Sequence, residues 1–145
     1  MSVNTDDLRI DSITELLEPE TLIREIPPTQ QAQRTVNDAR AAIHNILSGS
    51  DDRLLAVVGP CSIHDTKAAL DYAQRLKATA DAVQSEICVV MRVYFEKPRT
   101  IVGWKGLIND PYLDNTFQIN EGLKLARGLL SELADMGLAA GTEYL

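Results

Sequence analysis

Apolar positions recur along this chain with two different spacings, and these spacings predict where helices and strands lie. Three stretches repeat apolar residues every three or four positions, as one face of an amphipathic helix requires. The first begins after Pro28 and stops at Gly49, and the second starts at Asp65, a good helix N-cap. The third runs from Ile119 to a stop at Gly137. We therefore predict three helices, preceded by a lead-in that contains prolines.

The strands are predicted from runs that lack the helical spacing. Leu54–Val58 is a continuous apolar run, which is typical of a buried strand. From Ile87 to Phe95 the residues alternate, so that one face is wholly apolar while the other carries Arg92 near the carboxyl end. The last seven residues, AAGTEYL, predict a short third strand.

The order strand, helix, strand, helix, strand is typical of an α/β fold with a parallel sheet. Doubly wound sheets and (β/α)8 barrels both begin in this way, and Arg92 favours a barrel, whose rim accepts such a side chain. Because a barrel needs about 250 residues, we expect this chain to be the first part of a longer protein. We assign residues 1–50 to an N-terminal extension with a helix, and residues 51–145 to the first three βα units of a (β/α)8 TIM barrel.

The composition is that of a globular protein, with 145 residues, 45% of them hydrophobic, and a net charge of −7. Residues 1–28 hold seven acidic residues against two arginines, and so carry −5 of that charge. From Arg92 to Lys105 the sign reverses, with four cations against one glutamate. A short cationic segment suits a small anionic ligand, whereas nucleic-acid binding needs a broad basic face. We expect no nucleic-acid partner.

Other protein classes are excluded by what the sequence lacks. No apolar run is long enough for a membrane helix, and the acidic first residues do not form a secretory signal. The two cysteines, Cys61 and Cys88, make no disulfide framework. The common glycine-rich nucleotide-binding motifs are absent as well. We therefore expect a cytoplasmic protein without a membrane partner.

Each predicted strand ends in a polar or reactive residue: Cys61, Arg92 and Glu143. In a barrel these ends share one rim, where active sites form. A cysteine thiolate is a good ligand for late first-row metals, but the residues alone favour Cys61 as a small buried hydrophobe, because no CxxC or HxxxH partner is close. His64 could join it or serve as a cap or surface group. Glu143 could hold a water or a metal, or form a salt bridge at the edge.

The segment EKPRT displays two cations and a hydroxyl in a stiff order. Pro98 restrains Lys97 before it, and Arg99 and Thr100 follow directly. Arginine offers a fork for phosphate or carboxylate, and lysine a compact charge that can also donate a proton. We interpret the segment as an anion site rather than as a solvated loop. The following GWKGLINDP, with Lys105 between two glycines, we interpret as loop structure and packing.

Three motifs together resemble a known family. GPCSIHD, MRVYFEKPRT and GWKGLINDP occur in the order and spacing of class I 3-deoxy-D-arabino-heptulosonate 7-phosphate (DAHP) synthases, and the resemblance covers essentially the whole chain. It implies a (β/α)8 barrel that condenses phosphoenolpyruvate with erythrose 4-phosphate, a transferase reaction at the start of aromatic amino-acid biosynthesis. It also implies a divalent metal of the manganese, iron, cobalt or zinc type, with Cys61 as one ligand and the others outside this chain.

The resemblance further implies roles for individual residues. Arg92 and Lys97 match phosphoenolpyruvate contacts, Lys97–Thr100 match the erythrose 4-phosphate site, and Glu143 matches a position that holds an active-site water. Lys97 is also a candidate proton donor. The family implies a homo-oligomer inhibited by an aromatic amino acid, with Asp6 and Asp7 of the acidic lead-in at the regulatory site.

Two alternatives remain open from the residues themselves. One is a non-catalytic regulatory or binding fragment that keeps the sugar-phosphate segment. The other is a thiol enzyme with Cys61 as nucleophile and His64 as base.

Overall fold

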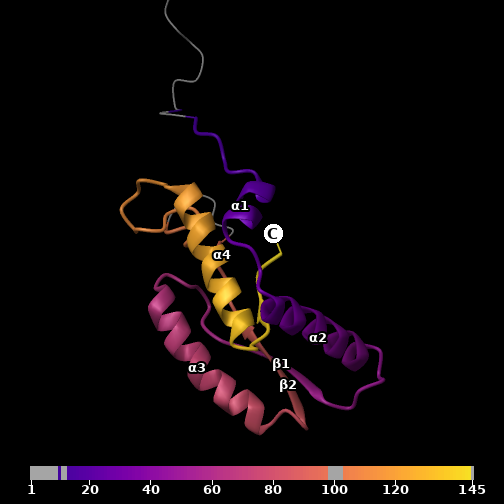
Figure 1. Ribbon diagram of the computed structural model, residues 1–145. Helices are drawn as coiled ribbons and strands as arrows, with labels where there is room; N and C mark the ends of the chain where they lie inside the picture. The colour runs from indigo at the N-terminus through magenta and orange to yellow at the C-terminus, as the bar shows by residue number, and fades with distance from the viewer. Residues whose placement is uncertain (1–9, 11–12, 98–102, 145) are drawn as a thin grey trace, which may run out of the picture.

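The computed structural model describes residues 10, 13–97 and 103–144, and it contains four helices and a small parallel sheet (Figure 1). The sheet has the order β1-β2-β3, and both neighbouring pairs are parallel. The elements in chain order are α1 (Pro19–Glu25), α2 (Gln30–Leu47), β1 (Leu54–Val58), α3 (Thr66–Ala82), β2 (Ile87–Arg92), α4 (Ile119–Asp135) and β3 (Ala140–Gly141).

The three predicted helices are confirmed, and their ends follow from local chemistry. Asp65 caps α3, because its carboxylate accepts the backbone N–H groups of Lys67 and Ala68 at 2.8 and 3.1 Å. Gly49 and Gly137 follow the ends of α2 and α4 with φ of 76°, a left-handed conformation that glycine adopts without steric cost. The structure adds a short helix, α1, within the segment predicted only as a lead-in.

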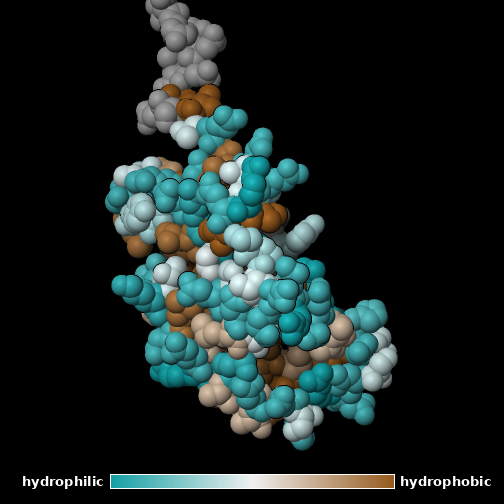
Figure 2. Space-filling view, in the orientation of Figure 1, coloured by the Kyte–Doolittle hydropathy of each residue, from teal (hydrophilic) through white to brown (hydrophobic). Residues whose placement is uncertain are grey.

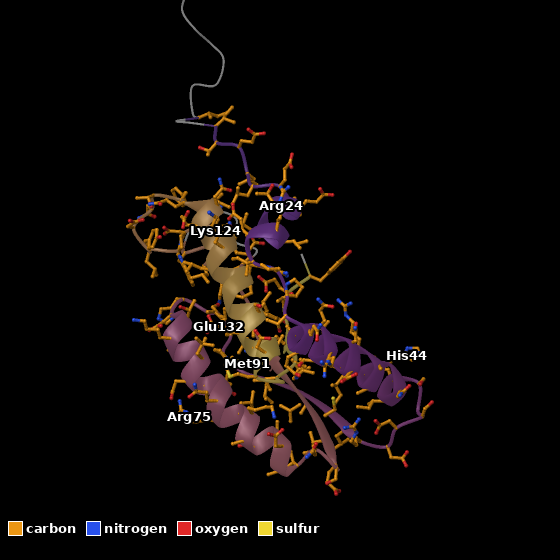
Figure 3. The ribbon with its side chains drawn as sticks, in the orientation of Figure 1. Arg24, His44, Arg75, Met91, Lys124 and Glu132 are labelled. Atoms are coloured by element: carbon orange, nitrogen blue, oxygen red, sulfur yellow. The ribbon has the colours of Figure 1, made fainter. Side chains whose placement is uncertain are left out.

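The two helices that connect the strands, α3 and α4, pack on the same face of the sheet. Alternate residues of β2 and the segment after it point into this layer, and Met91 lies by the C-terminal end of α4 (Figure 3). Met91 and Leu133 are fully buried. The buried cluster consists of Ile63, Ala69, Ala73, Met91, Val93, Phe95, Leu107, Ala126, Leu129, Leu133 and Leu138. The wholly apolar face predicted for the second strand therefore becomes the core.

The first strand departs from its prediction. Leu54–Val58 was expected to be buried, but the side chains of Leu54 and Val57 are 70% and 55% exposed. β1 is an edge strand of the sheet among the described residues, because its only partner there is β2. An apolar strand is buried only where layers cover both its faces and strands flank both its edges.

The buried face of α4 is wider than its spacing predicts. The helical spacing predicts an inward face of Ile119, Leu123, Ala126, Leu130 and Leu133. Ala126 and Leu133 are buried, and so is Leu129, which lies outside that set. Leu123 and Leu130 are only partly buried. The reason is that α4 has neighbours on two sides: α3 and the sheet on one, and the N-terminal helices on the other.

The N-terminal part packs along α4. The backbone N–H of Leu17 donates to Asn120 at 2.9 Å, and Lys124 forms an ion pair of 3.2 Å with Glu25, from the side of α4 that faces α1 (Figure 3). Thr29 lies just before α2, and its hydroxyl donates to the carboxylate of Asp135 at the end of α4. No helix in the described part of the chain is long and apolar enough to cross a membrane.

A cavity of about 620 Å³ lies between α2, α4 and the sheet. Apolar surface shows in the hollow between α2 and the strands (Figure 2). The cavity is lined by apolar side chains that include Ala32, Val36, Ile43, Val90, Leu130 and Leu138.

Candidate active site

The carboxyl ends of the strands meet at one edge of the sheet, as the parallel order requires. The exits of β1 and β2 are joined there by the Arg92 side chain. Its Nε donates to the carbonyl of Pro60 at 3.2 Å, and a second nitrogen lies 3.5 Å from the carbonyl of Gly59. Both acceptors belong to the exit of β1, so Arg92 holds the start of the Cys61 loop against β2.

Gly59 makes this approach possible. It has a φ of 147°, and a Cβ at this position would lie 2.7 Å from the carbonyl oxygen of Arg92. Any larger residue would push the two strand exits apart. The glycine therefore sets how closely the Cys61 loop can follow β2.

Tyr94 belongs to the site as well, although it was not predicted from the sequence. The guanidinium carbon of Arg92 lies 5.3 Å from the centre of the Tyr94 ring, a cation–π arrangement. A signal was available, because residues two apart on an extended strand share a face. The stack and the two carbonyls together fix a side chain that would otherwise sample many rotamers.

Glu143 follows β3 and contacts the main chain beyond β2. Its carboxylate accepts the N–H of Phe95 at 2.9 and 3.2 Å, and also the N–H of Glu96. This backbone contact was not among the roles considered from the sequence. Glu143 also lines a cavity of about 470 Å³, together with residues of α1 and α4.

Lys97 and Cys61 are brought together from two different loops. Lys97 Nζ lies 3.7 Å from Cys61 Sγ, within hydrogen-bond distance of a sulfur acceptor. The backbone N–H of Lys97 donates to the carbonyl of Lys105 at 2.8 Å. Cys61 is exposed at this edge, so it is not a small buried hydrophobe.

Five predicted site residues lie outside the described part of the chain. They are Pro98, Arg99 and Thr100 of the predicted anion site, and Asp6 and Asp7 of the predicted regulatory site.

His64 contacts an aromatic residue of the segment after the predicted anion site. Its ring meets Trp104 edge-on, with 6.4 Å between the ring centres. The neighbour of the Cys61 sulfur is Lys97 instead. The geometry therefore gives no support to His64 as a base for Cys61.

The described residues do not form a metal centre by themselves. Within residues 10, 13–97 and 103–144, no three of His, Cys, Asp and Glu come together in a way that could hold a metal ion. Cys61 offers one exposed sulfur, which is a single ligand of the four or more that a transition metal takes.

The segment after the predicted anion site is packed, as expected. Leu107 is buried in the core, and Asp110 is a buried carboxylate. The carbonyl of Asp110 accepts the indole N–H of Trp104 at 2.8 Å.

The fold and the site define a parallel α/β protein whose strand exits gather cations and a thiol. The sequence-family model of the DAHP synthetase I family matches residues 25–145 of this chain, and the chain belongs to this family. The resemblance of the three motifs is thereby confirmed.

Individual relatives agree with the family. The chain is 59% identical over 145 residues to "Phospho-2-dehydro-3-deoxyheptonate aldolase, Phe-sensitive" of Escherichia coli K12, covering all of this chain and 41% of the relative. It is 48% identical over 141 residues to the Trp-sensitive protein of the same organism, covering 97% of this chain and 40% of the relative. A relative from Amycolatopsis methanolica is 49% identical, with all of this chain and 71% of the relative covered.

A solved structure supports the arrangement of the elements. The phospho-2-dehydro-3-deoxyheptonate aldolase of Francisella tularensis SCHU S4 superposes with a TM-score of 0.90 at 52% identity, covering 94% of this chain and 40% of that one. The chain thus spans about 40% of the length of the two Escherichia coli relatives and of this structure.

Proposed function

We propose that this chain carries part of the active site of a DAHP synthase, which condenses phosphoenolpyruvate with erythrose 4-phosphate to DAHP and phosphate. The observation that carries the proposal is the meeting of Lys97 and Cys61 at 3.7 Å, from two motifs of the family, beside an anchored Arg92. Both substrates are anions, and positioned cations are what allow two anions to approach each other.

In this proposal, Arg92 and Lys97 bind phosphoenolpyruvate, and Lys97–Thr100 bind erythrose 4-phosphate. The enol carbon of phosphoenolpyruvate attacks the aldehyde carbon, water adds at C2, and phosphate leaves. Lys97 donates a proton to the oxygen that was the aldehyde oxygen. Glu143 supports substrate binding by holding the main chain that leads to Lys97, since its carboxylate accepts the N–H groups of Phe95 and Glu96.

We also propose a divalent metal of the manganese, iron, cobalt or zinc type, with Cys61 as one ligand. The exposure of Cys61 at the strand exits supports this, and the other ligands would come from sequence that the longer relatives possess. Such a metal supplies Lewis acidity toward a carbonyl oxygen. In a full-length polypeptide that carries this sequence, Cys61→Ser should lower the bound metal per subunit with unchanged circular dichroism, since a serine hydroxyl stays protonated. Full metal content in that variant would rule out Cys61 as a ligand.

For the architecture, we propose that β1, β2 and β3 are the first three strands of a (β/α)8 barrel. Two observations support this: the strands follow one another in chain order, and α3 and α4 cover the same face. In a barrel that face points outward, and the carboxyl ends form the catalytic rim.

Regulation is proposed from the names of the relatives, two of which are called Phe-sensitive and Trp-sensitive. We propose that the full-length protein is a cytoplasmic homo-oligomer inhibited by an aromatic amino acid, with Asp6 and Asp7 contributing to its binding. An amino group needs an acidic partner, and the charge of the first 28 residues could provide it.

The proposed activity is tested by phosphate release from the two substrates. The full-length polypeptide should turn over with added divalent metal, and the 145-residue chain alone should not. Adding phenylalanine, tyrosine or tryptophan singly to the active protein identifies the inhibitor. A full-length protein that binds phosphoenolpyruvate but releases no phosphate would support the non-catalytic alternative instead.

A further inference from the structure

Trp104 stands between the two loops that carry Cys61 and Lys97. It is partly buried and packs against the core, and its ring and its N–H point to different partners. Resting on the proposed function, we propose that Trp104 is a positioning residue: it acts on the reaction through Lys97, by fixing the segment of residues 104–110 (the clamp segment) on which the Lys97 backbone rests.

The ring of Trp104 contacts the loop that follows β1. His64 meets it edge-on at 6.4 Å, and the next residue back, Ile63, donates its N–H to the carbonyl of Tyr94 at 2.9 Å. The Cys61 loop is thus held to the segment after β2 on one side and to Trp104 on the other. Edge-to-face aromatic contacts favour a defined ring orientation.

The N–H of Trp104 closes the clamp segment on itself. It donates to the carbonyl of Asp110 at 2.8 Å, and the N–H of Asp110 donates to the carbonyl of Gly106 at 3.0 Å. These two hydrogen bonds join both ends of the segment and its middle. Asp110 is itself buried, and without the bond to Trp104 its carbonyl would keep only the longer hydrogen bond from the Leu113 N–H at 3.4 Å.

The clamp segment in turn holds the backbone of Lys97. The Lys97 N–H donates to the carbonyl of Lys105 at 2.8 Å, directly between Trp104 and Gly106. Gly106 has a φ of 123°, and a Cβ there would lie 1.9 Å from the carbonyl oxygen of Phe95. The clamp segment therefore lies against the main chain before Lys97, at a distance that only glycine permits.

Three consecutive backbone N–H groups are fixed in this way. Those of Phe95 and Glu96 are bound by Glu143, and that of Lys97 by Lys105. A lysine with a long flexible side chain can serve two substrates only if its backbone is held still, because displacement of a reacting group by about 1 Å can cost about 100-fold in rate.

The experiment is a double-mutant cycle in the full-length holoenzyme. Trp104→Phe keeps an aromatic ring but removes the N–H, and we expect kcat to fall by about tenfold in the wild-type background. In the Lys97→Ala background the same change should cost less than about twofold, because the residue that it positions is gone. The same cycle is read in the dissociation constant for phosphoenolpyruvate by calorimetry, which needs no turnover.

A matched control is Tyr112→Phe, which removes a polar group from an exposed aromatic side chain just beyond the clamp segment. It should leave kcat unchanged in both backgrounds. Rates are expressed per folded molecule from circular dichroism. Gly106→Ala, whose added Cβ would clash with the Phe95 carbonyl and with Glu96 and so move the main chain before Lys97, should show the same dependence on Lys97.

The outcomes separate this inference from the proposed function. If Lys97→Ala alone leaves the reaction unchanged, the proposed role of Lys97 is wrong, and this inference fails with it. If Lys97→Ala is severe but Trp104→Phe costs equally in both backgrounds, the proposed function stands, and Trp104 has a structural role only.

Discussion

β1 and β2 are neighbouring strands of nearly the same apolar character, but they differ in how far their side chains are buried. β2 places Met91 and Val90 in buried positions, whereas β1 exposes more than half of the Leu54 and Val57 side chains. The difference comes from their neighbours, since β2 pairs on both sides and β1 pairs only with β2 among the described residues. An apolar strand is stabilised by burial, but the strands and helices beside it determine whether it is buried.

The segments that follow β1 and β2, by contrast, are held in place in similar ways. Both are held by short contacts that do not depend on burial: the Gly59 and Pro60 carbonyls bind Arg92, and Ile63 binds the carbonyl of Tyr94. The residues with proposed chemical roles follow these exits. The site is thus built on backbone hydrogen bonds and close glycine contacts, not on the burial of the strands beneath it.

The largest expected effect tests the difference in burial between β1 and β2. In the 145-residue chain, Met91→Ala should lower the free energy of unfolding by about 2–5 kcal/mol, because it leaves a cavity in the core. Val57→Ala should change it by less than about 1 kcal/mol, because that side chain is mostly in water. Urea unfolding followed by circular dichroism measures both.

The same pair of variants in the full-length polypeptide should show a smaller difference. If five further strands close the barrel, Val57 becomes buried, and Val57→Ala should then cost about 1–3 kcal/mol. An unchanged small cost in the longer protein would contradict the proposed barrel closure around β1.

The next effect concerns the strand exits. In the full-length enzyme, Lys97→Ala should reduce turnover by about 30- to 1,000-fold, equivalent to about 2–4 kcal/mol, because it removes a charged contact made in the transition state. Lys105→Ala should have a much smaller effect, since its backbone carbonyl, and not its side chain, meets Lys97. Steady-state kinetics with both substrates provides the comparison, and equal losses would show that the site is misplaced.

The elements of the fold could be predicted because their signals are local. Helical spacing, the Asp65 cap and the terminating glycines all act within a few residues, and the three helices appear where they predict. The exposure of β1 could not be predicted in this way. It depends on which strands lie beside it, and that information is not contained in the run Leu54–Val58.

The candidate site could also be predicted only in part, because only some of its features follow from local signals. The strand-end rule placed Cys61 and Arg92 at one edge, and the structure brings Lys97 to Cys61 there. The rule could not show that Glu143 binds backbone N–H groups or that Trp104 reaches both His64 and Asp110. These contacts join residues tens of positions apart, or depend on a loop conformation that only the folded chain defines.

The smallest expected effect concerns the cap that begins α3, between the two strand exits. The hydrogen bond from the Ala68 N–H is the main cause that holds the pKa of the Asp65 carboxyl below its ordinary value; desolvation opposes it, and the N–H of Lys67 adds to the lowering. A pKa lowered by folding means that the charged carboxylate stabilises the native state above the unfolded pKa, which is about 4. That contribution is lost as the pH falls through the still lower folded pKa. Asparagine can also cap a helix but does not ionise, so the wild type should be slightly more stable than Asp65→Asn at pH 7. Urea midpoints measured from pH 7 to pH 3 should show this advantage constant above about pH 5 and shrinking below about pH 4. An advantage that persists unchanged at pH 3 would mean that the charge of Asp65 does not contribute to the cap.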